Sequence, residues 1–472
     1  MSNKKVTITT EVGLSPLAAV LPFAIFVVTT ITLSFINAVN INLLVAIGIL
    51  AILTGGVITK NCKGYWATIF EYFGSKTAMT ATLLWLIVGV YGNILKEGHI
   101  VEGLVWISTR LETLNETFTV ITFLFSGLFA ISTGSGFGTI SAMSLTLFPP
   151  GIAVGANPAL LGGAILSGAA LGDSIAPVSD TAVIAASTQE FEDGGRTADI
   201  GGTIKHRLPI VLTASLLTCI LFLVAGKLWA ISPESMPSNI SHDWFGLTMI
   251  LPTLVVIALS FLHVNIFVSL FSGIVLAVLI GTTMGLFGLS DLVCLEGNNV
   301  SGAVVDGIAG MANICILLMV VVSLSGLIIR SGCMNIILSF MNRHIRHSTI
   351  LAELSIFSMT ALSGILIAAV NTIANICIAP FVNSIGKRHQ IHPYRRSTIL
   401  ATVICTFPFV LPYGGCMLLL LKGIEASGSN VTLQATDMFL TAFYPWLLLI
   451  CSFATCFIRK RHNNETTDKT NP

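Results

Sequence analysis

Long apolar runs separated by short polar segments dominate the chain. They predict helices near 14–36, 39–60, 78–96, 206–230, 244–262, 264–286, 311–330 and 438–458. Each run is close to the roughly 20 residues that a helix needs to cross a bilayer. The first run is longer than the apolar core of a signal peptide and many further runs follow it, so we expect it to be a retained helix.

Composition agrees with this pattern. Of the 472 residues, 54% are hydrophobic and only 10% are charged, whereas soluble domains carry about 25% charged residues. We therefore predict an all-α polytopic membrane protein whose surroundings are the lipid bilayer. The formal net charge of +1 argues against a nucleic acid as a partner.

Basic residues predict the orientation of the helices. Most of the 23 lysines and arginines fall in clusters at 4–5, 60–76, 196–207, 330–346, 387–396 and 459–469. Because positive charge collects on the cytoplasmic side, both termini are expected in the cytoplasm, and a bacterial inner membrane is the expected location. The loops at 97–116 and 287–309 are then expected to face outward.

Two regions interrupt the helical pattern. Residues 118–188 contain STGSGFG and GDSIAPVSD, and residues 349–420 contain NTIAN and FPFVLPYGG. In the first region we expect a re-entrant hairpin at about 118–149 followed by a broken helix at about 158–188. In the second we expect a hairpin at about 349–385 followed by a broken helix at about 397–420. This arrangement agrees with the orientation that the basic residues predict. The chain then has about ten transmembrane helices in two inverted repeats, 1–235 and 236–472. Paired broken helices of this kind indicate the binding site of a transporter.

The stretch GDSIAPVSDT, residues 172–181, carries the chemistry. Asp173 and Asp180 lie in an apolar span, where a carboxylate costs at least about 2.5 kcal/mol and is rarely kept without a function. Pro177 cannot donate a backbone hydrogen bond to the carbonyl of Asp173, so that oxygen is expected to be free for a ligand. The structural alternative is that either aspartate caps a half-helix, with Asp180 accepting N–H groups from the helix that follows.

Oxygen ligands of this kind suit Na+, which binds as other hard cations do. A buried carboxylate pair also attracts protons, so Na+ and H+ are expected to compete at the aspartates and to be exchanged by alternating access. The hairpin tips and the mirrored break complete the predicted site. Its residues are Asp173, Asp180, Ser179, Thr181, Pro177, Ser135, Thr139, Asn371, Thr372, Asn375 and Tyr413.

These motifs resemble a known family. GDSIAPVSDT is similar to the GD-x-x-(S)P-x-SDT signature of the NhaC-type sodium/proton antiporters, and STGSGFGT resembles their upstream glycine-rich tip. The resemblance implies a secondary transporter of the ion-transporter superfamily with paired hairpins. Ser174, Phe137 and the stretch LPYGGC depart from the family pattern, which bears on the substrate more than on the fold.

The same family includes malate/lactate exchangers and amino-acid permeases, so a second hypothesis stays open. In it the protein is a sodium- or proton-coupled carrier of a small organic acid or amino acid, held at the acid-free mirrored site around Asn371 and Tyr413. Neither interrupted segment holds a lone arginine or histidine that would clamp an anion, and this favours cations.

Other classes receive little support. The HExxH and GxSxG motifs are absent, which argues against the commonest hydrolases, and STGSGFG follows no strand as a nucleotide-binding loop would. The ten cysteines form no CxxC pair, and the histidines match no metal site. We therefore expect neither an enzyme nor a resident cofactor. Internal repeats favour a carrier over a channel, and a homo-oligomer is compatible with either.

Overall fold

The computed structural model describes residues 12–16, 18–35, 41–100, 102–103, 115–177, 179–192, 196–229, 244–262, 264–296, 299–332, 348–368, 371–429 and 431–457. Within these ranges, the elements of the N-terminal half are helices, with one isolated β-bridge between Glu190 and Thr197. The helices are α1 (Val20–Phe35), α2 (Ile41–Ile58), α3 (Cys62–Phe73), α4 (Lys76–Glu97), α6 (Asn115–Thr133), α7 (Gly136–Thr146), α8 (Phe148–Ala153), α9 (Pro158–Ile175), α10 (Asp180–Ser187) and α11 (Ile200–Leu228).

The C-terminal half is also helical apart from one short β-hairpin. Its elements are the 3-10 helix η2 (Trp244–Met249), α12 (Ile250–Phe261), α13 (Ile266–Thr283), α14 (Leu289–Leu292), β1 (Cys294–Glu296), β2 (Asn299–Ser301), α15 (Ala303–Arg330), α17 (Thr349–Leu366), α18 (Asn371–Arg388), α19 (Pro393–Ile404), α20 (Phe407–Val410), α21 (Gly415–Ala426), α22 (Ala435–Phe439) and α23 (Phe443–Thr455).

The predicted all-α polytopic class is confirmed. Within the described ranges, six helices are long and apolar enough to cross a membrane, or seven if the pair α19–α20 and α21, bent by 40°, counts as one span. The predicted total of about ten would include shorter apolar helices such as α1, α13 and α23. The antiparallel hairpin β1–β2, with Cys294 opposite Ser301, lies in the loop at 287–309 and was not predicted.

Both interrupted regions have the predicted element order. In the first, α6 and α7 are joined at Gly134 and Ser135 and are followed by α9 and α10. Gly134 has a φ of 64°, a backbone conformation that glycine adopts without strain, and this permits the sharp turn at the hairpin tip. In the second region, α17 and α18 are followed by α19, α20 and α21.

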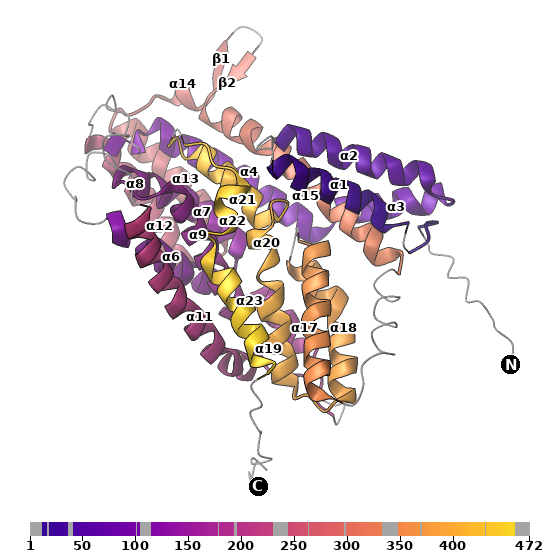
Figure 1. The fold of residues 1–472 in the computed structure, drawn as a ribbon. Coiled ribbons are helices and arrows are strands. Elements are labelled where there is room, and N and C mark those ends of the chain that lie inside the picture. Colours follow the sequence, from indigo (N-terminus) through magenta and orange to yellow (C-terminus); the bar gives the residue numbers. More distant parts are fainter. Residues whose placement is uncertain are drawn as a thin grey trace, which may run out of the picture.

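The helices form two groups, which Figure 1 shows side by side. In one group, α15 packs against α2, α3 and α4. The other group is centred on α9, which contacts α6, α7, α11 and α23. Fifteen of the 18 residues of α9 are buried, against nine of the 29 residues of α11, so α9 is the central helix and α11 presents much of its surface to the surroundings.

Small residues allow α9 to approach α6 closely. A Cβ atom on Gly172 would lie 2.1 Å from the Cβ of Ala130, and one on Gly168 would lie 2.6 Å from the carbonyl oxygen of Phe123. Gly172 is therefore a packing residue within α9, which continues beyond it to Ile175.

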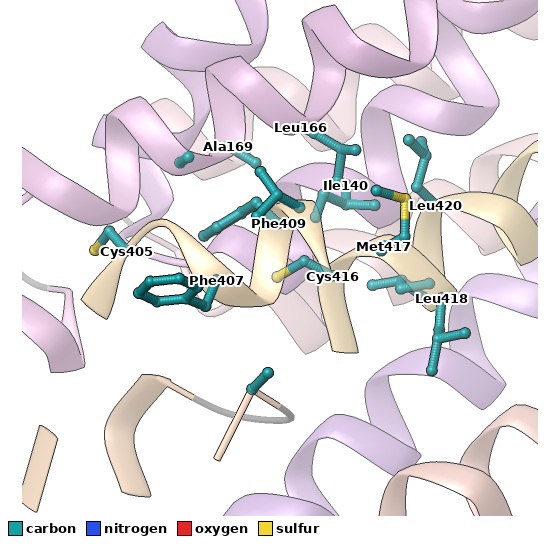
Figure 2. Close-up of a cluster of buried hydrophobic side chains, with 14 of the residues drawn as sticks. Ile140, Leu166, Ala169, Cys405, Phe407, Phe409, Cys416, Met417, Leu418 and Leu420 are labelled. Carbon is teal, nitrogen blue, oxygen red and sulfur yellow. The ribbon is translucent and has the colours of Figure 1, made fainter. Parts of the chain in front are cut away.

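The short helix α20 fixes the second interruption against both hairpins. Phe407 and Phe409 extend from opposite sides of α20 (Figure 2). The ring of Phe409 lies against Gly136 at the start of α7, and the ring of Phe407 lies against Gly364 of α17. The break in the second half is consequently filled by apolar side chains.

Candidate functional site: a cavity between the interrupted helices

The first interruption brings a serine onto a carboxylate. Helix α9 ends at Ile175, and α10 begins at Asp180 with Ser179 in the N-cap position. Ser179 makes no side-chain capping bond to α10, and its hydroxyl donates to Oδ1 of Asp173 at 2.6 Å. Pro177 lies in the loop between the two half-helices, as predicted.

Asp173 is the most highly coordinated carboxylate in the described part of the chain. Its side chain is buried, and Nδ2 of Asn371 donates to Oδ2 at 2.5 Å in addition to the bond from Ser179. Longer contacts to the same oxygen come from Thr181 Oγ1 at 3.5 Å and from Cys405 Sγ at 3.7 Å. Since every one of these groups donates a hydrogen bond, the arrangement suits an ionised carboxylate. Both halves of the chain supply donors.

Asp180 lies in a different environment. Its side chain is exposed, it is the first residue of α10, and the described residues offer it no hydrogen bond or ion pair. It therefore does not cap α10, contrary to the structural alternative considered above. The positive N-terminal end of a helix dipole stabilises a negative charge at this position.

The two hairpin tips approach this interruption. Ser135 caps α7 by accepting a hydrogen bond from the backbone N–H of Gly138 at 3.0 Å. On the other hairpin, Asn375 donates from Nδ2 to the carbonyl of Thr181 at 3.0 Å. The carbonyl oxygens of the Asn371 and Asn375 side chains are buried and accept no hydrogen bond from the described residues.

A cavity of about 470 Å³ lies where these elements meet. Its lining comes from both helix groups: α4 and α13 on one side, and the hairpin tips and interrupted helices on the other. The lining residues are Lys76, Thr80, Ala81, Leu84, Gly134, Ser135, Gly136, Phe137, Asp173, Asp180, Thr181, Ile184, Phe267, Asn371, Thr372, Pro408 and Cys416. The N-terminal ends of α7, α10, α18 and α21 all face this space.

Six of the predicted site residues line the cavity, and five do not. Those on the wall are Asp173, Asp180, Thr181, Ser135, Asn371 and Thr372. Ser179 and Asn375 lie behind it and hydrogen-bond to residues that do. Thr139 is buried and donates to the carbonyl of Ser135 at 2.8 Å, while Tyr413 donates to the carbonyl of Ile365 at 2.9 Å. Pro177 is exposed and remains outside the lining.

Two basic residues near the site were not foreseen. Lys76 lines the cavity from the first turn of α4, and Arg207 is fully buried in α11. The basic-residue pattern predicts both in clusters at the cytoplasmic ends of the helices near 78–96 and 206–230. The true starts, Lys76 and Ile200, follow the N-caps Ser75 and Asp199, and these cap residues are the signal that would have extended both helices.

A charged cluster joins the two halves at the end of α10. Lys387 forms an ion pair of 2.5 Å with Glu190, and this hydrogen bond lowers the pKa of Glu190 below its ordinary value. The Tyr394 hydroxyl donates to Asp199, and together with the N–H of Gly202 it lowers the pKa of Asp199. Arg396 also bridges the halves, since it donates to the carbonyl of Glu190. The loop after α10 is thus fastened to α18 and α19.

The donor set of the cavity suits a hard cation. The described residues contain no group of three or more His, Cys, Asp or Glu side chains placed to hold a metal ion. Ligands beyond the carboxylates would be amide, hydroxyl and carbonyl oxygens, which hard cations such as Na+ prefer. The fold and this cavity define a polytopic membrane protein with a polar site between interrupted helices.

Comparison with known proteins places this site in a family context. Residues 2–227 match the profile of the Na+/H+ antiporter family, and this segment includes both aspartates. The chain is 28% identical over 244 residues to the Na(+)/H(+) antiporter NhaC of Alkalihalophilus pseudofirmus, covering 48% of this chain and 51% of that protein. The resemblance inferred from GDSIAPVSDT is confirmed.

A second relative is named for a different activity. The Malate-2H(+)/Na(+)-lactate antiporter of Bacillus subtilis is 25% identical over 288 residues, covering 56% of this chain and 59% of that protein. The matches thus span little more than half the length of these relatives. Among solved structures, the Alcanivorax borkumensis YdaH transporter matches with a TM-score of 0.39 and 15% identity, covering 85% of this chain and 89% of that one.

Proposed function

We propose that the protein is a sodium/proton antiporter that exchanges Na+ for H+ at Asp173. The observation that carries the proposal is the buried carboxylate of Asp173, which lies on the cavity wall and is coordinated from both halves of the chain. An intramembrane carboxylate of this kind is a functional site by default. The family match of residues 2–227 supports the same conclusion.

The proposed exchange follows from competition for one carboxylate. Na+ would bind to ionised Asp173. The amide oxygen of Asn371, which lines the cavity and accepts no hydrogen bond from the described residues, is available as a further ligand. A proton on Asp173 removes the charge that attracts the cation, so the two ions exclude each other. Asp180, exposed on the same wall, adds negative charge that draws cations into the cavity.

The test is transport by the purified protein in proteoliposomes that contain a pH-sensitive dye. Addition of Na+ outside acid-loaded vesicles should raise the internal pH, and K+ or choline should not. The rate should saturate with Na+ concentration, as expected of a carrier. Absence of any Na+-dependent proton movement in vesicles that contain folded protein would overturn the proposal.

The orientation is also part of the proposal. The distribution of basic residues supports cytoplasmic termini in a bacterial inner membrane. On that orientation, the cavity opens toward the cytoplasm, since Lys76 lies at the cytoplasmic end of α4. A cysteine at Leu289, which is 70% exposed, should react with an impermeant reagent from outside, and one at Arg388 should not. Labelling at Arg388 but not at Leu289 would overturn the proposed orientation.

We further propose that residues 1–235 and 236–472 are inverted repeats. The support is that a hairpin followed by an interrupted helix occurs in each half, as α6–α10 and as α17–α21. The labelling experiment also tests this proposal when a cysteine at the exposed Lys60 is added. Lys60 follows α2 and Leu289 follows α13, and inverted repeats require these two equivalent positions to lie on opposite sides of the membrane.

A second function is favoured by one specific observation. The cavity volume of about 470 Å³ exceeds what a single Na+ requires, and Lys76 on its wall offers a partner for a carboxylate. The facing N-terminal helix ends would also attract an anionic group. A coupled carrier of a small organic acid would show Na+- or H+-driven uptake of malate, lactate or an amino acid in the same vesicles.

A further inference from the structure

Arg207 is a buried charge that the proposed exchange does not use. Its side chain is 0% exposed, although it lies within the long apolar helix α11. Burying an isolated cation is costly unless it is paired or hydrogen-bonded. A charged residue at this depth therefore calls for a partner and a purpose.

The contacts of Arg207 connect it to the proposed ion site. Its Nη1 donates to the backbone carbonyl of Ser174, the residue directly after Asp173. The hydroxyl of Ser174 in turn pairs with the Tyr444 hydroxyl at 2.9 Å and donates to the carbonyl of Leu171 at 2.7 Å. Arg207 thus holds the last turn of α9, which carries Asp173.

The rest of the guanidinium group is unsatisfied. Nε and Nη2 of Arg207 are buried and have no hydrogen-bond partner among the described residues. Among the described residues, Asp173 is the carboxylate that acts on Arg207 electrostatically. Asp173 lines the cavity and Arg207 does not, and the arginine contacts the backbone at the next residue, Ser174, so its charge lies within the protein beside the turn that carries Asp173.

We propose that Arg207 is a positioning residue that fixes the end of α9 and, as a permanent positive charge beside the turn that carries Asp173, weakens the binding of Na+ there. This inference rests on the proposed exchange at Asp173. A transporter must release its cargo on the far side as well as capture it. The arginine neutralises part of the carboxylate charge in the empty site and repels a cation bound there, which favours release.

The test compares variants that separate charge from packing. Arg207→Met removes the charge and leaves no unsatisfied polar side chain in the apolar surroundings, so folding should be retained. The Na+ concentration at half-maximal rate should fall by about tenfold, the size expected for removing one nearby charge at intermediate dielectric. The maximal rate should fall too, because release is slower. Arg207→Lys keeps the charge and should remain within about threefold of the wild type.

Tyr444→Phe is the matched control. It removes a hydrogen bond from the same serine without altering charge, so its half-maximal Na+ concentration should equal that of the wild type. An unchanged value in Arg207→Met, or an equal fall in Tyr444→Phe, would overturn the proposed role of the charge. Wild-type protein that shows no Na+ response would instead overturn the exchange proposal and this inference with it.

Discussion

The two interrupted helices present different chemistry to the same cavity. The first, α9–α10, contributes Asp173, Asp180 and Thr181, whereas the second, α19–α21, contributes Pro408 and Cys416. The polar contribution of the second half comes from its hairpin, through Asn371 and Thr372. Similar element order in the two halves therefore does not bring similar function.

The difference indicates a division of labour. The first half holds the charges, and it is also the segment that matches the antiporter profile. The second half packs its interruption with apolar side chains such as Phe407 and Phe409 (Figure 2) and supplies a neutral amide to Asp173. Variants in the first half should alter ion coupling, and those in the second should alter stability or affinity.

The largest effect is expected for Asp173→Asn. The amide keeps the shape of the side chain but cannot bind a proton in exchange for Na+, so Na+-driven proton movement should fall by about 100-fold or more. The internal dye signal in proteoliposomes measures this, and size-exclusion chromatography checks that the variant is folded. Exchange at the wild-type rate would show that Asp173 only caps or packs.

The second region should respond to Phe409→Ala mainly through stability. This ring is 0% exposed, and truncation of a buried phenylalanine costs about 3–5 kcal/mol. The melting temperature of the purified protein should fall clearly. Phe271→Ala is the control, because Phe271 is 65% exposed and should change the melting temperature little. Equal shifts in both variants would mean that α20 does not anchor the second interruption.

Sequence patterns predicted the interruptions well because each has a clear local cause. Apolar runs that stop at STGSGFG and GDSIAPVSD predicted the hairpin and the broken helix, and the isolated aspartates predicted a candidate site, where both line the cavity. The partner Asn371 could be proposed from its position at a hairpin tip. Its contact with Asp173, 198 residues away, depends on packing that no local pattern encodes.

The sequence pattern did not predict some other features, because no long apolar run marks them. Helix α3 has only 12 residues and begins after the N-cap Asn61, so it is shorter than the run of roughly 20 apolar residues that predicts a membrane span. Helix α11 begins at Ile200, six residues before the apolar run predicted from 206, so Arg207 lies in its third turn and not at its end. Sequence patterns also did not distinguish Asp173 from Asp180, because the burial and the hydrogen-bond partners of a side chain are set by the tertiary structure.

Asn371→Leu should weaken the link between the halves. The side chain loses its hydrogen bond to the Asp173 carboxylate, and a hydrogen bond to a charged group stabilises by about 1.5–3 kcal/mol, so transport should fall by about tenfold or more. The matched control is Asn313→Leu, since Asn313 is exposed and bonds to Asn42. Loss of protein from the membrane in Asn371→Leu alone would indicate a structural role.

Asp180→Asn should have a smaller effect than Asp173→Asn. Asp180 is exposed to the cavity without a hydrogen bond, so its charge acts through solvent and its loss should raise the half-maximal Na+ concentration by about threefold. The maximal rate should persist. Complete loss of exchange would restore the sequence-based expectation that the two aspartates act as an inseparable pair, whose titrations are then coupled.

The smallest effect concerns the contact between the halves at Glu190. Its ion pair with Lys387 is partly exposed, with side-chain exposures of 45% and 33%, so its contribution to stability is modest. The pKa of Glu190 is lowered in the folded protein, chiefly by the hydrogen bond from Lys387. A lowered carboxyl pKa stabilises the fold above the ordinary value of about 4.3, and this contribution disappears as pH falls through the folded value. Glu190→Gln should therefore lower the melting temperature slightly at pH 7 and leave it unchanged near pH 3. A difference that grows toward low pH would contradict the sign of this linkage and would mean that the halves are held together at this point by contacts other than the ion pair.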